Sequence, residues 1–233
     1  MKLRLASRAR PLLCDSSSRT ITARYSAQQL DGKRRCKAAL QRLFGLPQRR
    51  KVPLFGMTGR LVTQKGLDLI LGAHDLLAGD AQFVFLGSGE QRYEQALVEL
   101  ALSAPNRIGV QLDFSDRLEH RLMAGADIFL MPSLYEPCGL TQMRSQRYGA
   151  PPIVRCVGGL RDTVEDGVTG FWFDAYTPEA FAAAARRALD CYADPARWHA
   201  LMRNGMAADF SWERSVATYL DVYRRALSRS GAR

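Results

Sequence analysis

The pattern of hydrophobic and polar residues changes at Val52. Residues 1–30 show no sustained periodicity, and a short helix is expected from Gly32 to Leu43. From Val52 onward, short apolar runs typical of buried strands alternate with amphipathic segments typical of helices. Strands are expected at 53–58, 82–87, 107–112, 127–131 and 152–156, and helices at 65–77, 90–103, 116–124 and 141–148. This alternation predicts an α/β fold with a single Rossmann-like, doubly wound parallel sheet.

Beyond residue 173 the pattern predicts a helical C-terminal end. Helices are expected at 178–191, 195–205 and 212–227, and Ser211 is a suitable N-cap for the last of them. The apolar positions of that last helix form a broad face that needs a packing partner: Val216, Tyr219, Leu220, Val222, Tyr223 and Leu227. We therefore divide the chain into a basic, partly disordered leader (1–50), a Rossmann-like lobe (51–210) and a C-terminal helix with its tail (211–233).

The basic charge of the chain is concentrated at its N-terminus. The formal net charge is +10, but residues 1–51 hold 14 of the 33 lysines and arginines and only two of the 23 acidic residues. The remaining residues are close to neutral. A basic tail is usually solvated, and this one lacks a nucleic-acid-binding motif, so we expect no nucleic acid as a partner. No run is long enough to predict a membrane span, and no membrane partner is expected.

The N-terminal composition and the cysteines bear on localisation. The first thirty residues are rich in Arg and Ser and lack the apolar core of a secretory signal. The five cysteines are widely spaced without a C-x-x-C pair, as in reduced cytosolic proteins. We expect a cytoplasmic protein, with a plastid location as the alternative if the leader is a transit peptide.

The loop after the strand at 127–131 carries the most informative chemistry. Pro132 ends this strand, because proline cannot donate to a sheet ladder, and a helix is expected from Thr141. Open α/β sheets bind ligands in such loops, at the carboxyl ends of parallel strands. Glu136 is suited to accept hydrogen bonds from sugar hydroxyls, although a carboxylate here could also serve only the helix dipole. The free amides of the following helix favour a phosphate or a sugar oxygen.

Three glycine-containing loops follow other strands. In the loop 56–66, Arg60 and Lys65 are suited to a diphosphate, although glycines beside cations are also common in ordinary turns. The loop 85–90 is more typical of a tight turn into a helix. The adjacent Gly158 and Gly159 would let backbone approach a ligand closely in the same cleft.

Other reactive residues do not form a predicted site. His74 and His199 lack metal-ligand spacing, and His120 is more typical of a helix surface or a core than of a catalyst. Cys138 has no His or Asp nearby in the sequence and is expected to pack behind the site rather than act as a nucleophile. We expect no metal and no cofactor.

Several motifs in matching order closely resemble bacterial glycogen synthase and plant starch synthase. They are the segments 59–66 (GRLVTQKG), 136–142 (EPCGLTQ), 147–149 (RYG), 158–160 (GGL) and 162–164 (DTV). The resemblance extends from about Ala23 to Arg225 and implies a retaining glucosyltransferase built from two Rossmann-like lobes. By this resemblance, the chain is the donor-binding C-terminal lobe. The whole enzyme would transfer glucose from ADP-glucose to the non-reducing end of an α-1,4-glucan acceptor.

The resemblance also implies roles for individual residues. Arg60 and Lys65 hold the diphosphate and stabilise the leaving ADP, and Glu136 binds glucose hydroxyls; these are the expected catalytic residues. Phe114 takes the place of a tyrosine that stacks on adenine. The other expected substrate-binding residues are Gly59, Cys138, Gly139, Leu140, Thr141, Gly158 and Gly159.

Two departures from the family pattern stand out. Arg144 lies where relatives carry a second acid or a tyrosine, which puts the ribose contacts in doubt. The family's other lobe, with its catalytic Asp and His and most of the glucan site, is not expected within these residues, so a separately encoded N-terminal lobe would be a partner. The final helix would cross back to that lobe. Since retaining transfer needs donor and acceptor oriented together, the chain alone is expected to be inactive.

Two alternatives remain open from the sequence. The chain could be a non-catalytic module that binds ADP or ADP-glucose, or it could be a different nucleotide-sugar transferase of the same architecture. The second alternative is disfavoured by the segment 136–142, because sucrose and mannosyl transferases usually carry other residues around the acid.

Overall fold

The structure is a computed structural model that describes residues 20–230. It contains a six-stranded sheet in which all neighbouring strands are parallel, in the order β3-β2-β1-β4-β5-β6. The strands are β1 (Leu54–Thr58), β2 (Gln82–Leu86), β3 (Ile108–Gln111), β4 (Ile128–Met131), β5 (Pro152–Arg155) and β6 (Phe171–Phe173). The expected doubly wound parallel sheet is confirmed, and its strand order reverses between β1 and β4.

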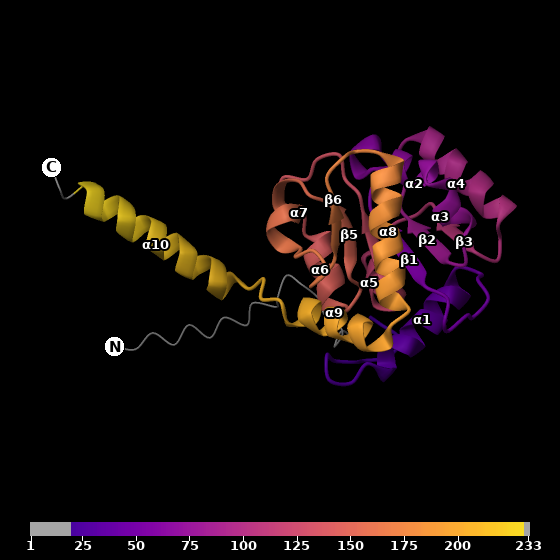
Figure 1. Cartoon of the computed structure of the whole chain (residues 1–233), viewed down its shortest axis with the longest axis horizontal. Coiled ribbons are helices and arrows are strands. Elements are labelled where there is room, and N and C mark those ends of the chain that lie inside the picture. The colour runs from indigo at the N-terminus through magenta and orange to yellow at the C-terminus, as the bar shows by residue number, and fades with distance from the viewer. Residues whose placement is uncertain (1–19, 231–233) are drawn as a thin grey trace.

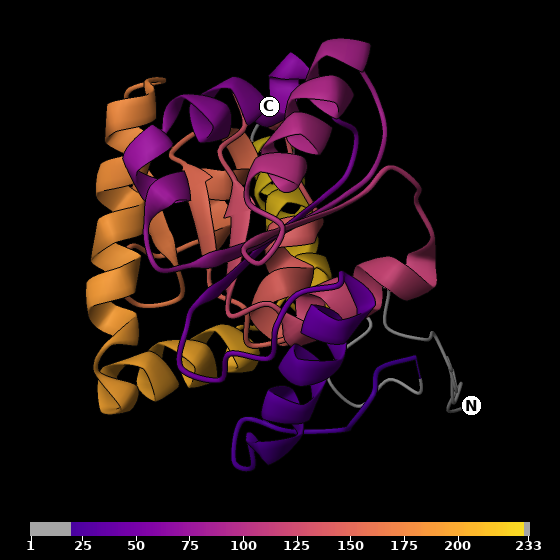
Figure 2. The same ribbon diagram turned by 90° about the vertical axis from the view of Figure 1, so that its right-hand side faces the viewer.

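Helices connect successive strands and cover both faces of the sheet. They are α1 (Asp31–Leu43), the 3₁₀ helix η1 (Thr63–Lys65), α2 (Leu67–Gly72), α3 (His74–Ala78), α4 (Gln91–Ser103), α5 (Asp116–Gly125), α6 (Thr141–Arg147), α7 (Gly158–Thr163), α8 (Pro178–Tyr192), α9 (Pro195–Ala207) and α10 (Trp212–Ser230). Figure 2 shows α8 and α1 on opposite sides of the sheet.

Alternate residues of β1, β2, β4, β5 and β6 enter different cores, because successive side chains of a strand point to opposite faces. In β1, Phe55 belongs to the core that includes residues of α2, α3, α4 and α8, whereas Leu54 belongs to the core that includes residues of α1, α5 and α7. The strands β1, β2 and β4 are buried on both faces, which explains why they appear in the sequence as continuous apolar runs.

Residues 20–46 are part of the folded body. Tyr25 is buried and its hydroxyl donates to the Tyr148 carbonyl at 2.8 Å, while Cys36 and Leu40 of α1 pack against α5. The helix expected at 32–43 is therefore confirmed. Residues 1–19 of the predicted leader lie outside the described residues, and the proposed boundaries at 50 and 210 stay predictions.

The expected single helix at 65–77 is wrong, because the chain forms η1, α2 and α3 instead. Gly66 adopts φ +76° between η1 and α2, and a Cβ there would lie 2.1 Å from the Pro132 carbonyl oxygen. Gly72 ends α2 against Pro178 of α8. The breaks follow from contacts with distant segments, which helical periodicity does not reveal.

The last helix, α10, extends away from the sheet and its covering helices (Figure 1). The expected apolar face is present, and its large side chains are exposed: Val216, Tyr219, Leu220, Val222, Tyr223 and Leu227. Over residues 20–230, none of the helices combines the length and the apolar character that crossing a membrane requires.

Candidate functional site

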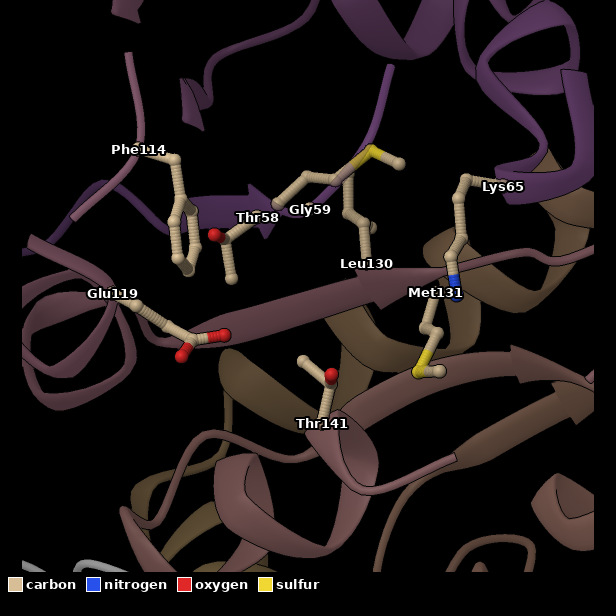
Figure 3. Close-up of a pocket in the computed structure, with 9 residues that line it drawn as sticks. Thr58, Gly59, Lys65, Phe114, Glu119, Leu130, Met131 and Thr141 are labelled. Carbon is tan, nitrogen blue, oxygen red and sulfur yellow. The ribbon is translucent and has the colours of Figure 1, made fainter. Parts of the chain in front are cut away.

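A small cavity lies where the strand order reverses, at the carboxyl ends of β1 and β4 (Figure 3). Its volume is about 140 Å³. Open α/β sheets bind ligands at this point because the loops leaving the two strands separate and create a crevice. The lining residues are Met57, Thr58, Gly59, Lys65, Phe114, Glu119, Leu130, Met131 and Thr141.

Lys65 and Glu136 meet across the crevice although they are 71 residues apart. The Lys65 ammonium lies 2.6 Å from Glu136 Oε2, and the two side chains are 21% and 11% exposed. Two hydrogen bonds hold their loops together, since the Leu134 amide donates to the Gln64 carbonyl and the Gln64 side chain donates to the Tyr135 carbonyl, both at 2.9 Å. A cation and a carboxylate are thus fixed side by side at the edge of the sheet.

An aromatic ring and a helix start complete the cavity wall. The Phe114 side chain is half exposed and lines the cavity on the side away from Lys65 (Figure 3). Thr141 is the first residue of α6, and the N-cap residue Leu140 offers no side-chain acceptor to the first turn. The walls therefore combine a flat apolar surface, a cation and backbone amides, which suits a ligand with a ring and an anionic group.

Arg60 is not part of the cavity wall. It lies on the same loop as Gly59 and Lys65, but its side chain is exposed and has no hydrogen bond or ion pair within residues 20–230. The structure brings Lys65 and Glu136 into contact, whereas the exposed Arg60 is not among the residues that line the cavity. Its predicted phosphate contact stays a prediction.

The glycines at 158 and 159 bring two loops into backbone contact. The Gly159 amide donates to the Glu136 carbonyl at 3.1 Å. A Cβ on Gly158 would lie 2.2 Å from the Glu136 carbonyl oxygen, and one on Gly159 would lie 2.0 Å from that of Cys138. These glycines are thus required to hold the Glu136 loop, whether or not they also approach a ligand.

Gln142 supports the same loop from inside α6. Its side-chain amide is buried and donates to the carbonyls of Cys138 and Gly139 and to the Thr163 hydroxyl, at 2.9–3.2 Å. Gly139 itself needs its left-handed φ of +72°. Cys138 and Leu140 lie on the exposed side of the loop, so the expectation that Cys138 packs behind the site is wrong.

Sequence reasoning missed Glu119 as a cavity residue. This residue of α5 is only 7% exposed, and its Oε2 accepts from Arg144 Nη1 of α6 at 3.0 Å. Burial raises the pKa of Glu119, and the Arg144 charge opposes that shift. The available signal was the unusual Arg144, whose partner lies 25 residues earlier in the chain.

His120 is a buried residue that does not line the cavity. It is buried in α5, and its Nδ1 lies 2.9 Å from the Tyr148 hydroxyl. Within residues 20–230 no group of three or more His, Cys, Asp or Glu side chains could hold a metal ion.

Comparison with known proteins identifies close relatives of the sequence. The family described as glycosyl transferases group 1 matches residues 43–204. Glycogen synthase from Anaeromyxobacter sp. (strain Fw109-5) is 52% identical over 215 residues, which cover 90% of this chain and 45% of the relative. Glycogen synthase from Thioalkalivibrio sulfidiphilus (strain HL-EbGR7) is also 52% identical, over 90% of this chain and 46% of the relative.

A solved structure is similar over nearly the whole chain. The catalytic domain of starch synthase IV from Arabidopsis thaliana, bound to ADP and acarbose, matches with a TM-score of 0.83 and 33% identity. The match covers 92% of this chain and 46% of the starch synthase chain, so the chain spans about half the length of the relatives it matches. The expected resemblance to glycogen and starch synthases is confirmed, and the chain belongs to the glycosyl transferases group 1 family.

Proposed function

We propose that this chain is the donor-binding half of a glycogen or starch synthase, which transfers glucose from ADP-glucose to the non-reducing end of an α-1,4-glucan with retention. The observation that carries the proposal is the contact between Lys65 and Glu136 at the reversal of strand order, with Phe114 on the other side of the same cavity. The identity to glycogen synthases and the ADP bound to the similar starch synthase support the choice of donor.

The cavity and the adjacent Glu136 loop would offer each part of ADP-glucose a chemically suitable contact. The Phe114 ring provides a stacking surface for adenine, at the side of the cavity opposite Lys65. Lys65, assisted by Arg60 from the same loop, would face the diphosphate and stabilise the negative charge that builds on the leaving ADP. Glu136 would accept hydrogen bonds from glucose hydroxyls, and Thr141 would lie beside the phosphate.

The amides of the Glu136 loop would assist in holding the sugar. Cys138, Gly139 and Leu140 lie between Glu136 and the start of α6, and Gln142 fixes this stretch from below. Gly59 lines the cavity with backbone alone because it has no side chain, and its φ of +135° is one that favours glycine.

A second lobe would complete such an enzyme. The matched relatives are about twice as long as the region they share with this chain. We infer that the glucan site and the remaining catalytic groups come from that lobe, in the same polypeptide or in a separate one. Transfer would then require both lobes, because donor and acceptor must be oriented together.

Substitution of Lys65 tests the phosphate contact. In the purified full chain, Lys65→Ala should weaken ADP binding by about tenfold or more, since a charge-assisted contact to phosphate is lost. Titration calorimetry with ADP measures this directly. Lys51→Ala is the matched control, because Lys51 is an exposed lysine just before the opposite end of β1. Equal ADP affinity in the Lys65 variant and the control would refute the proposed phosphate role.

An incorporation assay separates the enzyme from a non-catalytic module. The full chain is incubated with glycogen and ADP-glucose labelled in the glucose, alone and with the N-terminal half of a glycogen synthase relative. Incorporation only in the presence of the second half would support the proposal. ADP binding without incorporation in either mixture would instead favour a binding module.

A further inference from the structure

The cavity contains a buried carboxylate that none of the roles above uses. Glu119 lines the cavity together with Phe114, and both side chains lie on the side away from Lys65 (Figure 3). Only 7% of the residue is exposed. A buried carboxylate needs partners, because moving an ionised group out of water is costly.

Arg144 is a hydrogen-bond partner for one of the two oxygens of this carboxylate. Its Nη1 lies 3.0 Å from Glu119 Oε2, and within the described residues the second oxygen, Oε1, has no hydrogen-bond partner. Arg144 is itself partly buried, and its Nε has no hydrogen-bond partner among the residues that the structure describes. The pair therefore keeps one carboxylate oxygen available as an acceptor in the cavity.

The position of Glu119 matches the ribose of the proposed donor. In a nucleoside diphosphate the ribose lies between the base and the phosphates. A base against Phe114 and a diphosphate near Lys65 and Thr141 would bring the ribose past Glu119. An ionised carboxylate accepts hydrogen bonds only, and the ribose presents two neighbouring hydroxyl donors.

We infer that Glu119 recognises the ribose hydroxyls of the nucleotide, and that Arg144 is the positioning residue that holds its carboxylate toward them. This inference rests on the proposed function. It assigns Arg144, the departure from the family pattern, a role through a partner on α5 rather than through direct contact with the ribose.

Deoxynucleotides test the inference without any substitution. Calorimetry on the full chain compares ADP with 2′-deoxy-ADP and 3′-deoxy-ADP. Loss of a hydroxyl bound to a charged acceptor should weaken binding by roughly tenfold or more for at least one analogue. Equal affinity for all three nucleotides would overturn the inference while leaving ADP binding, and hence the proposed function, intact. Failure of ADP itself to bind would overturn both.

Substitution of Glu119 then assigns the effect to this residue. Glu119→Gln should weaken the binding of ADP about tenfold and leave the binding of the deoxy analogue nearly unchanged. The preference for ADP over the deoxy analogue should therefore disappear. Glu99→Gln, at an exposed carboxylate of α4, is the control and should retain the preference for ADP. If Glu119→Gln does not fold, Glu119→Asp retains the charge but withdraws the carboxylate, and should reduce the discrimination. Full discrimination in a folded Glu119 variant would overturn the inference.

The role of Arg144 is tested by the ratio of the affinity for ADP to the affinity for its deoxy analogue. Arg144→Ala should reduce the preference for ADP over its deoxy analogue, and Arg144→Lys should partly restore it because a cation remains near Glu119. A residue that only stabilises the fold would weaken both nucleotides equally. An unchanged ratio in Arg144→Ala would overturn the positioning role.

Discussion

At the scale of single residues, the contact between Lys65 and Glu136 is the central feature of the site. The two side chains are largely buried, so each reduces the cost of burying the other. A diphosphate bound at Lys65 would compete with Glu136 for the ammonium. The pair can therefore be separated experimentally into a phosphate contact and a sugar contact.

Glu136→Gln should affect ADP-glucose and ADP differently. The substitution removes the carboxylate proposed to bind glucose hydroxyls, so the affinity for ADP-glucose should fall by about tenfold. The affinity for ADP should not fall, because Lys65 keeps its charge and loses a competitor. Calorimetry with the two ligands measures the difference, and an equal loss for both would exclude Glu136 from the sugar site.

Lys33 shows how a buried cation makes stability depend on pH. Its ammonium donates to the carbonyls of Ala124, Ala126 and Tyr148 at 2.8–3.2 Å. Burial lowers the pKa of Lys33 to about 8, although Asp127 opposes the shift. Between about pH 8 and 10.5 the unfolded chain therefore holds a proton that the folded chain has released, and stability rises with pH across this window.

We expect the free energy of unfolding of the wild type to rise relative to Lys33→Met from pH 7 to pH 10.5. A shift of this size corresponds to about 3 kcal/mol. Urea denaturation of both proteins at several pH values measures the difference, with Lys51→Met, at an exposed lysine, as the control variant. A difference that does not change with pH would mean that Lys33 titrates normally in the folded protein.

At the scale of elements, backbone contact between the loop after β4 and the start of α7 holds the Glu136 loop in place. Gly159→Ala should cost at least about 2 kcal/mol, because its Cβ would lie 2.0 Å from the Cys138 carbonyl oxygen. It should also weaken ADP-glucose binding by moving the loop. Thermal unfolding and calorimetry measure the two effects.

Gly79→Ala, at a glycine outside this loop, is the matched control for Gly159→Ala. Its Cβ would meet its nearest neighbour at an ordinary 3.4 Å, so its effect on stability should stay within about 0.5 kcal/mol. A Gly159 variant as stable as this control would mean that the two loops separate easily.

Most strands and helices could be predicted because their signals are local. Five strands and the amphipathic helices appear as apolar runs and periodic faces, and each expected strand overlaps an observed one. β6 was missed because three residues are too short to show a period. α7 was missed because it begins with two glycines, which are poor helix formers.

At the scale of the whole molecule, α10 and the rest of the fold differ in how far their large apolar side chains are buried. Trp198 of α9 is buried in the core, whereas Trp212 of α10 is 62% exposed. Because burial determines the cost of removing a large apolar side chain, the two tryptophans form a matched pair.

Trp198→Ala should destabilise the chain by about 3–5 kcal/mol, whereas Trp212→Ala should change stability by less than about 0.5 kcal/mol. Chemical denaturation of the two variants beside the wild type measures both values. A large loss in Trp212→Ala would show that α10 packs against another surface in solution.

The candidate site was predictable only in part, because its loops are local but its contacts are not. Lys65, Glu136 and Phe114 follow strands whose carboxyl ends must share one edge of a parallel sheet, so their grouping could be expected. The pairing of Glu119 with Arg144 depends on how α5 and α6 pack.

The sequence by itself determined the alternation of strands and helices, the doubly wound class and the loops that carry chemistry, because periodicity and turn residues act over a few positions. The tertiary structure decided which distant residues meet: Lys65 with Glu136, Glu119 with Arg144, and Lys33 with three carbonyls. Those contacts depend on strand order and helix packing, which bring together groups separated by 25 to 115 residues.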